Sequence, residues 1–202
     1  MKPDILDFWR RAQLAHINPA ITDEFPEGWD VREELRELFG NRQVTDIGCG
    51  YGRLCTAFHP ERYSGYDLNP AAIETARQRH PSYRFTLMRD PLDYPAGDAA
   101  LLYAVLVHVH DDDIEATVAP LCRRANFIVV AEIMQRSWRG EGMPRPKGAP
   151  PVFNRDVSEY VAMFAMQGFD VDDVVVAPYK RYPDTKMTFL ALAREGAAGD
   201  SG

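Results

Sequence analysis

The chain has 202 residues, of which 46% are hydrophobic and 26% charged, and it carries a net charge of −7. This length fits one ordinary domain, and the composition is typical of a globular protein rather than of a disordered or collagen-like chain. The acidic balance argues against a nucleic-acid substrate, because binding many phosphates requires Lys and Arg gathered on one face.

The sequence also bears on location. Its longest apolar stretch, 99–107, is about half of the roughly 18 residues that a membrane span needs, and the N-terminus has no signal-peptide layout. The three cysteines (Cys49, Cys55 and Cys122) form no C-x-x-C pair, so neither a disulfide framework nor a zinc site is indicated. We therefore expect a cytoplasmic protein with no membrane partner.

Residues 1–40 precede the first predicted strand and are expected to form an N-terminal helical cap. Two helix candidates, 5–15 and 31–39, lie among the aromatic residues Phe8, Trp9, Phe25 and Trp29. Such clusters either pack as ordinary core, here against the sheet edge, or cover an active site. The sequence leaves both alternatives open.

Short apolar runs alternate with helix-like segments from residue 43 to about residue 167. This alternation is typical of β-α-β units that build a mostly parallel sheet. Asn69 followed by Pro70 predicts a helix start, because Asn caps the first turn and Pro fits its first position. The predicted strands are 44–47, 63–66, 83–88, 99–104 and 127–133, and the predicted helices begin near Gly52 or span 71–80, 112–123 and 157–167.

The pattern changes after Gln167, where two strand-like runs, 169–176 and 186–193, are joined by a segment that contains Pro178 and Pro183. This pattern predicts an antiparallel hairpin. We therefore expect an α/β fold, a Rossmann-like three-layer sandwich whose mostly parallel seven-stranded sheet is closed by an antiparallel hairpin. The sheet domain is expected to span 41–195, and the tail, 196–202, is expected to be disordered.

The segment 44–54 carries the most specific signal. Gly48, Gly50 and Gly52 follow the first predicted strand, where glycines permit a tight turn and let a ligand approach the backbone. Asp46 stands two positions before the first glycine, and Asp67 ends the second predicted strand. A carboxylate at the end of that strand can accept both ribose hydroxyls of a nucleoside.

A nicotinamide dinucleotide fits this pattern poorly. Its fingerprint requires Gly or Ala where the chain has Arg53. Asp46 beside the loop would also repel a pyrophosphate, whereas it suits the ammonium group of an amino acid. The pattern therefore favours a nucleoside with a positively charged tail.

With these motifs, residues from about 43 to 194 resemble the class I S-adenosylmethionine-dependent methyltransferases. The resemblance implies that Asp46 and the glycines hold the methionine part of S-adenosyl-L-methionine, and that Asp67 binds its ribose. It also implies that Asp90 contacts the adenine amino group. Pro91 lacks the backbone N–H that this position commonly offers, so the adenine contact shifts to Leu92 or is lost.

The resemblance extends along the chain, because Asp98 precedes the fourth predicted strand, which leads into Val105-Leu106-Val107-His108, and the predicted hairpin matches the family's last two strands. Cys49 is expected to line the pocket rather than act as a nucleophile. For Asp46 the alternative is a strand-end residue that binds local backbone. The implied cofactor-binding residues are Asp46, Gly48, Cys49, Gly50, Gly52, Asp67, Leu68, Asp90, Pro91 and Leu92.

Candidate catalytic residues follow the fourth predicted strand. An alcohol or phenol must lose a proton to accept a methyl group, and His is the side chain best matched to that task at neutral pH. His108 and His110 lie at the carboxyl edge where cofactor and substrate meet, although His108 could instead order the loop. Tyr103 either lines the transfer site or packs in the core. The run of three aspartates at 111–113 predicts a helix start and no metal site.

The segment 136–155 is basic, and it either holds a phosphate or carboxylate of the acceptor or is a solvated loop. We expect O-methylation of a small molecule or sugar, with such an acidic group on the acceptor. The alternatives are an N- or protein methyltransferase, or a non-catalytic S-adenosylmethionine-binding protein. The absence of an Asn-Pro-Pro-Tyr signature argues against methylation of adenine or glutamine. The basic residues of the segment are Arg136, Arg139, Arg145, Lys147 and Arg155.

Overall fold

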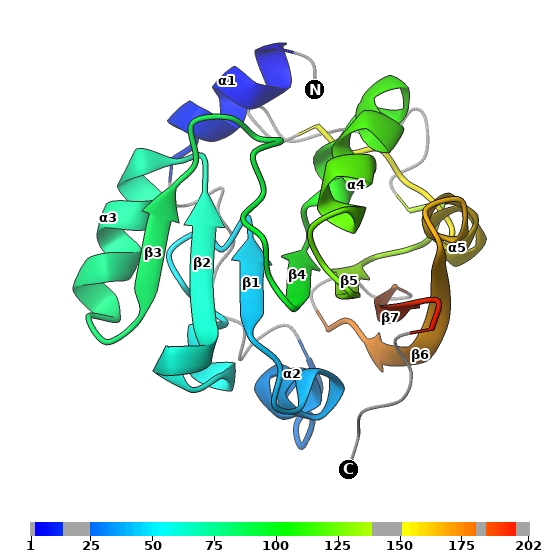
Figure 1. The fold of residues 1–202 in the computed structure, drawn as a ribbon, viewed down its shortest axis with the longest axis horizontal. Helices are drawn as coiled ribbons and strands as arrows, with labels where there is room; N and C mark the ends of the chain where they lie inside the picture. The colour runs from blue at the N-terminus through cyan, green and yellow to red at the C-terminus, as the bar shows by residue number, and fades with distance from the viewer. Residues whose placement is uncertain (1–2, 14–24, 139–150, 181–184, 197–202) are drawn as a thin grey trace.

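The computed structural model describes residues 3–13, 25–138, 151–180 and 185–196. These residues form a seven-stranded sheet with helices on both faces (Figure 1). The strand order is β3-β2-β1-β4-β5-β7-β6. The strands are β1 (Val44–Ile47), β2 (Tyr63–Asp67), β3 (Arg84–Leu87), β4 (Ala99–Tyr103), β5 (Phe127–Glu132), β6 (Phe169–Pro178) and β7 (Lys186–Arg194).

Strands β1 to β5 are parallel to one another, whereas β7 pairs antiparallel with both β5 and β6. The strand order reverses at β1, which pairs with β2 on one side and with β4 on the other. In a parallel sheet, ligands bind at the carboxyl ends of the strands beside such a reversal. The predicted Rossmann-like fold and its closing hairpin are confirmed.

Five α-helices are described: α1 (Pro3–Arg11), α2 (Val31–Phe39), α3 (Pro70–Arg79), α4 (Ile114–Cys122) and α5 (Val157–Ala165). Helix α2 packs on one face of the sheet through buried side chains at the helical spacing of Val31, Leu35 and Phe39. Helices α4 and α5 pack on the opposite face. Helix α1 lies beyond the carboxyl ends of β2 and β3 (Figure 1).

The helix predicted to begin near Gly52 is wrong. Residues 51–54 form turns, followed by short 3-10 helices at Cys55–Ala57 and Pro60–Arg62. Gly52 has a φ of +79°, and a Cβ there would lie 2.7 Å from Cζ of Phe85. This left-handed residue interrupts the helical pattern, and Pro60 prevents a longer helix from resuming, because proline lacks the N–H that a helix interior needs.

The other predicted helices of the sheet domain are present: 71–80 is shifted by one residue, and 112–123 and 157–167 are shortened, while α2 has its predicted bounds. Asn69 caps α3, because its side chain accepts a hydrogen bond from the Ala72 N–H. The aspartates 111–113 form a 3-10 turn that leads directly into α4, as their predicted role at a helix start requires. Among the described residues, no helix is both long and apolar enough to span a bilayer.

Candidate cofactor and active site

The glycine loop after β1 crosses to the end of β2. The N–H groups of Gly48 and Cys49 both donate to the Tyr66 carbonyl, at 2.7 and 3.1 Å, and the Gly50 N–H donates to Oδ2 of Asp67 at 2.8 Å. Gly48 has a φ of +74°, and a Cβ there would lie 2.7 Å from Cγ2 of Val105. The loop therefore needs glycine at position 48 both for its turn and for its approach to the segment after β4.

Asp67 is the last residue of β2 and is half-buried. Each of its carboxylate oxygens accepts a hydrogen bond from a different backbone N–H. Oδ1 accepts from the Asn69 N–H and Oδ2 from the Gly50 N–H, both at 2.8 Å. Burial raises the pKa of Asp67, while these two N–H groups lower it. A carboxylate has about four acceptor sites, so each oxygen retains a position for a ligand hydroxyl. These acceptor positions fit the hydroxyls of a nucleoside ribose.

Asp46 has a partner inside the protein. Its side chain is buried, and Oδ2 accepts a hydrogen bond from the Tyr63 hydroxyl at 2.6 Å. Burial raises the pKa of Asp46 to about 7, against the lowering effect of Tyr63 and the Arg53 guanidinium. Arg53 also lies over the ring of Tyr103, 4.5 Å from its centroid. Contact between Asp46 and a cofactor ammonium stays a prediction.

Two further residues of the predicted site belong to the core. Cys49 is buried beside Phe85 and Ile73, and burial raises the pKa of its thiol well above the ordinary value, which makes it a poor nucleophile. Tyr103 is buried in the cluster that contains Phe189. Whether Tyr103 also lines a transfer site stays a prediction.

The residues predicted to contact adenine follow β3. Asp90 is exposed, and its Oδ1 accepts the Leu92 N–H at 2.9 Å. Leu92 therefore already uses the N–H that was expected to replace the missing donor of Pro91. Leu68 is half-buried against the large core cluster on the α4 and α5 face. The adenine contacts of these residues stay predictions.

The turn after β4, residues 106–110, carries both candidate histidines. Nδ1 of His108 lies 2.6 Å from the Pro151 carbonyl oxygen, and the His108 ring is 4.6 Å from the ring of Trp9. Nδ1 of His110 accepts the Asp112 N–H at 3.1 Å. A carbonyl oxygen only accepts, so Nδ1 of His108 carries the proton and Nε2 carries the lone pair. Nδ1 of His110 also lies 3.2 Å from a carboxylate oxygen of Asp112, so its contacts fix no single tautomer.

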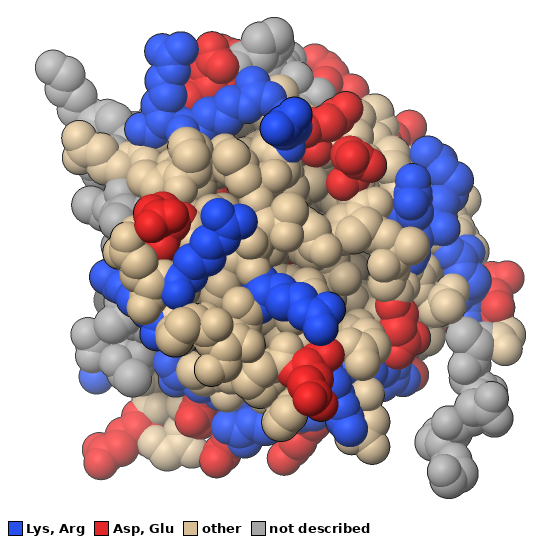
Figure 2. Space-filling model, turned by 60° about the vertical axis from the view of Figure 1, so that its left-hand side comes forward, with Lys and Arg blue, Asp and Glu red and all other residues tan. Residues whose placement is uncertain are grey.

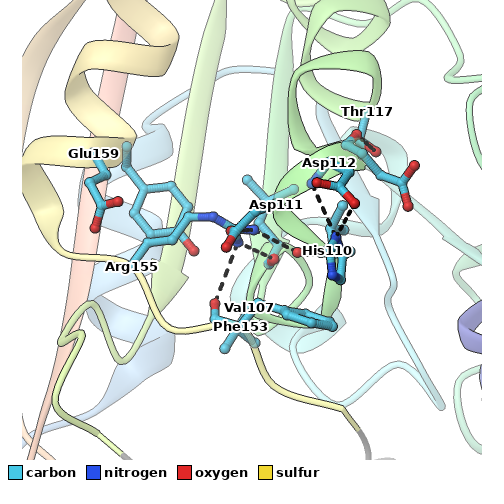
Figure 3. Close-up of polar contacts among 12 residues, drawn as sticks. Val107, His110, Asp111, Asp112, Thr117, Phe153, Arg155 and Glu159 are labelled. Atoms are coloured by element: carbon cyan, nitrogen blue, oxygen red, sulfur yellow. Dashed lines mark hydrogen bonds and ion pairs between the residues drawn. The ribbon is translucent and has the colours of Figure 1, made fainter. Parts of the chain in front are cut away.

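The basic segment is only partly described, because Arg139, Arg145 and Lys147 lie outside the described residues. Arg136 pairs with Glu159, and its backbone N–H donates to Asp156. Arg155 is buried and reaches Asp111 (Figure 3). Both described arginines therefore bind carboxylates of the chain itself, and neither supports the predicted site for an acidic acceptor.

Helix α1 contributes contacts that the sequence did not predict. The Asn69 side chain, which caps α3, also donates to the carbonyls of Trp9 and Ala12 at 2.9 and 2.8 Å. Arg10 donates to the Arg89 carbonyl after β3. The described part of the N-terminal cap thus contacts the segments that follow β2, β3 and β4. The aromatic pair Phe8–Trp9 was the available signal, but it did not distinguish a core position from a cover.

The surface on the α3 and β3 side of the molecule carries charges of both signs. Figure 2 shows basic and acidic side chains interspersed there. Binding of nucleic acid by charge requires a continuous basic surface, which this face does not offer. Across the described residues, His, Cys, Asp and Glu side chains form no group of three that could hold a metal ion.

Comparison with known proteins identifies the domain. Residues 44–126 match the family model described as a methyltransferase domain. A phthiotriol/phenolphthiotriol dimycocerosates methyltransferase of Mycobacterium tuberculosis is 38% identical over 65 residues, which cover 30% of this chain and 21% of that protein. The chain thus matches about a fifth of the length of this curated relative.

Solved structures share the fold. Magnesium protoporphyrin IX methyltransferase from Synechocystis PCC 6803, with bound S-adenosylmethionine, has a TM-score of 0.67 at 14% identity over 95% of each chain. Mitomycin 7-O-methyltransferase has a TM-score of 0.57 at 21% identity, over 78% of this chain and 50% of that chain. The family match supports the resemblance to class I S-adenosylmethionine-dependent methyltransferases, and the solved structures show that the fold is shared.

Proposed function

We propose that this methyltransferase domain transfers a methyl group from S-adenosyl-L-methionine to a hydroxyl of a small molecule or sugar. One observation carries the proposal: the glycine loop closes on Asp67 beside the turn that holds His108 with its lone pair on Nε2. A nucleoside-binding carboxylate and a nitrogen able to take a proton thereby flank the same strand ends. The matched methyltransferase family supports this proposal.

The proposed cofactor-binding residues lie along the ends of β1, β2 and β3. Asp67 would accept both ribose hydroxyls, and Gly48 and Gly50 would bring bare backbone to the methionine part. Asp90 would remain on the adenine side. When bound, the cofactor supplies an electrophilic methyl group, so alignment of the acceptor oxygen performs much of the catalysis.

We assign the proton-accepting role to His108 rather than His110. With Nδ1–H on the Pro151 carbonyl, Nε2 of His108 is the nitrogen that can take a proton from an acceptor hydroxyl at neutral pH. Nδ1 of His110 faces both the N–H and the carboxylate of Asp112 at its own helix start, so these contacts do not fix a lone pair on its Nε2. Trp9, whose ring is tilted against that of His108, would form an apolar wall for the acceptor.

The setting of the proposed enzyme is the cytoplasm. Its three cysteines, all in the described residues, are buried free thiols, as in a reducing compartment. The acceptor is proposed to be a small molecule because the net charge of −7 opposes nucleic acid. An acidic group on the acceptor is left out of the proposal, because Arg136 and Arg155 are held by Glu159 and Asp111.

The first test is cofactor binding by the purified chain. Calorimetry with S-adenosylhomocysteine should give saturable binding that NAD does not displace. Asp67→Ala should weaken that binding by more than about tenfold, or roughly 1.5 to 3 kcal/mol, because charged acceptors are lost from both ribose hydroxyls. Asp170→Asn, an exposed residue of β6, is the matched control. Equal affinity of the Asp67 variant and the wild type would remove the ribose assignment.

The second test identifies the acceptor class. Labelled methyl from S-adenosylmethionine is followed into a host extract separated into small-molecule, glycan, protein and nucleic-acid fractions. Label in the first two fractions supports the proposal. Label confined to protein or nucleic acid would make a macromolecular methyltransferase the better account, and binding without any transfer would favour a non-catalytic cofactor-binding protein.

A further inference from the structure

The 106–110 turn, which carries His108, is held by two buried side chains of opposite charge. Glu132, the last residue of β5, accepts the Val107 N–H at 3.0 Å. Arg155, just before α5, donates to the Leu106 carbonyl at 3.0 Å and to the Val109 carbonyl at 2.7 Å. The Glu132 carboxylate thus accepts one backbone N–H of the turn, and the Arg155 guanidinium donates to two of its backbone carbonyls.

Both side chains have a further partner outside the turn. Glu132 accepts the Tyr160 hydroxyl from α5 at 2.6 Å, and Arg155 pairs with Asp111 at 2.6 Å (Figure 3). The exposed fractions of Glu132 and Arg155 are only 1% and 4%. Burying charges costs several kcal/mol unless their partners are in place, so every one of these bonds constrains the geometry of the turn.

The same turn runs beside the 151–155 segment that carries Arg155. The Phe153 N–H donates to the Val107 carbonyl at 2.8 Å, and the Pro151 carbonyl accepts from His108. Arg155 and the carbonyl that fixes the His108 tautomer therefore belong to one short segment. A shift of the segment relative to the turn would lengthen the 2.6 Å contact between Pro151 and His108.

We propose that Glu132 and Arg155 are positioning residues for proton transfer to His108: they lock the 106–110 turn against the 151–155 segment, so that Nδ1 of His108 stays on the Pro151 carbonyl and Nε2 keeps the lone pair. This inference rests on the proposed function, in which His108 takes the acceptor proton. Neither positioning residue touches the acceptor. Their charges act through the backbone of the turn.

The decisive readout is the tautomer of His108, which a contribution to stability alone would not change. Protein with ¹⁵N-labelled histidine is recorded at neutral pH, and His108→Gln assigns the resonance among the five histidines of the chain. The wild type should show His108 with a proton on Nδ1 only. Arg155→Met should convert this single form into a mixture, because the turn loses two hydrogen bonds and the adjoining Asp111 loses its ion pair.

Arg136→Met is the matched control. Arg136 also pairs with a carboxylate near α5, but it makes its side-chain bonds to Glu159 and not to the turn. This control should keep the Nδ1–H form. Glu132→Met should behave as Arg155→Met does, because the Val107 N–H loses its acceptor. Arg155→Lys should give an intermediate result, because one ammonium can still reach a carbonyl of the turn.

Activity supplies the second readout. In the labelled-methyl assay with the host-extract fractions, Arg155→Met should transfer label at least tenfold more slowly than wild type, while its affinity for S-adenosylhomocysteine stays within twofold. A wild-type tautomer together with a wild-type transfer rate in this variant would overturn the inference. If Arg155→Met does not fold, Arg155→Lys and Glu132→Met carry the same test.

The inference and the proposed function fail in different ways. If the chain is not a methyltransferase, the wild type transfers no label in any fraction, whereas the tautomer shift in Arg155→Met still appears if the two charges position the turn. If the wild type transfers label and the Arg155 and Glu132 variants retain the Nδ1–H form, the proposed function stands and the positioning role is refuted.

Discussion

The buried carboxyl of Asp46 should make the stability of this protein depend on pH. Burial raises its pKa in the folded protein to about 7, from an ordinary value of 3.8, although Oδ2 accepts the Tyr63 hydroxyl. The folded protein therefore binds this proton more tightly than the unfolded chain does. The contribution of the group to stability is full below pH 4, falls as the pH rises toward 7, and is constant above it.

The size of the effect follows from that difference, because about three pKa units correspond to about 4 kcal/mol. Between pH 5 and pH 8 the wild type should lose about 2 to 3 kcal/mol through Asp46. In Asp46→Asn the amide oxygen can still accept from Tyr63 and no charge is buried. The free energy of unfolding of the variant should therefore lack this part of the decline, whatever constant cost the new amide N–H₂ group adds.

The assay is urea unfolding followed by circular dichroism at half-unit steps from pH 5 to pH 8. The quantity of interest is the stability of Asp46→Asn minus that of wild type, which should rise by about 2 to 3 kcal/mol over this range. Other buried carboxyls, such as Glu132 with a pKa of about 7, are present in both proteins and cancel in the difference. A difference that stays constant from pH 5 to pH 8 would refute the reasoning, as would the same rise in Asp170→Asn.

Three further outcomes are expected from the contacts around the strand ends. Asn69→Ala removes a helix cap and the two hydrogen bonds to the carbonyls of Trp9 and Ala12. It should lower the free energy of unfolding, measured in urea, by about 2 to 3 kcal/mol. Gly48→Ala, with its φ of +74° and a Cβ 2.7 Å from Val105, should cost about 1 to 3 kcal/mol, and adding Val105→Ala should recover part of the loss in thermal melts. Trp9→Ala should weaken binding of S-adenosylhomocysteine about fivefold in calorimetry if the Trp9–His108 pair holds α1 over the cofactor, and unchanged affinity would make α1 a packing element only.

The sequence predicted the sheet well because its strands are short apolar runs separated by strong local signals. The cap at Asn69 depends on residues three positions apart, and the hairpin depends on a change in periodicity after Gln167. The helix expected near Gly52 failed for a non-local reason. The position of Phe85, 33 residues away, fixes the space beside Gly52, and no local pattern reveals it.

The candidate site divides in the same way. The position of Asp67 could be predicted, because an acidic residue directly ends the second apolar run. In the structure the glycine loop contacts Asp67 there. The partner of Asp46 could not be predicted from the sequence, because Tyr63 reaches Asp46 only through the register of β1 and β2. Glu132 does carry a sequence signal: it is a carboxyl in an otherwise apolar strand, which requires a partner.

The choice between the two histidines shows why the chemistry of such a site depends on distant residues. His108 and His110 stand two positions apart after the same strand, and sequence spacing favours neither. Their contacts differ because His108 meets a carbonyl 43 residues away, whereas His110 meets the N–H and the carboxylate of Asp112 at its own helix start. The carbonyl leaves the lone pair on Nε2 of His108, whereas an N–H and a carboxylate together fix no single tautomer of His110. The ability of this turn to take a proton is thus set by the 151–155 segment, which Arg155 ties to the turn and Asp111.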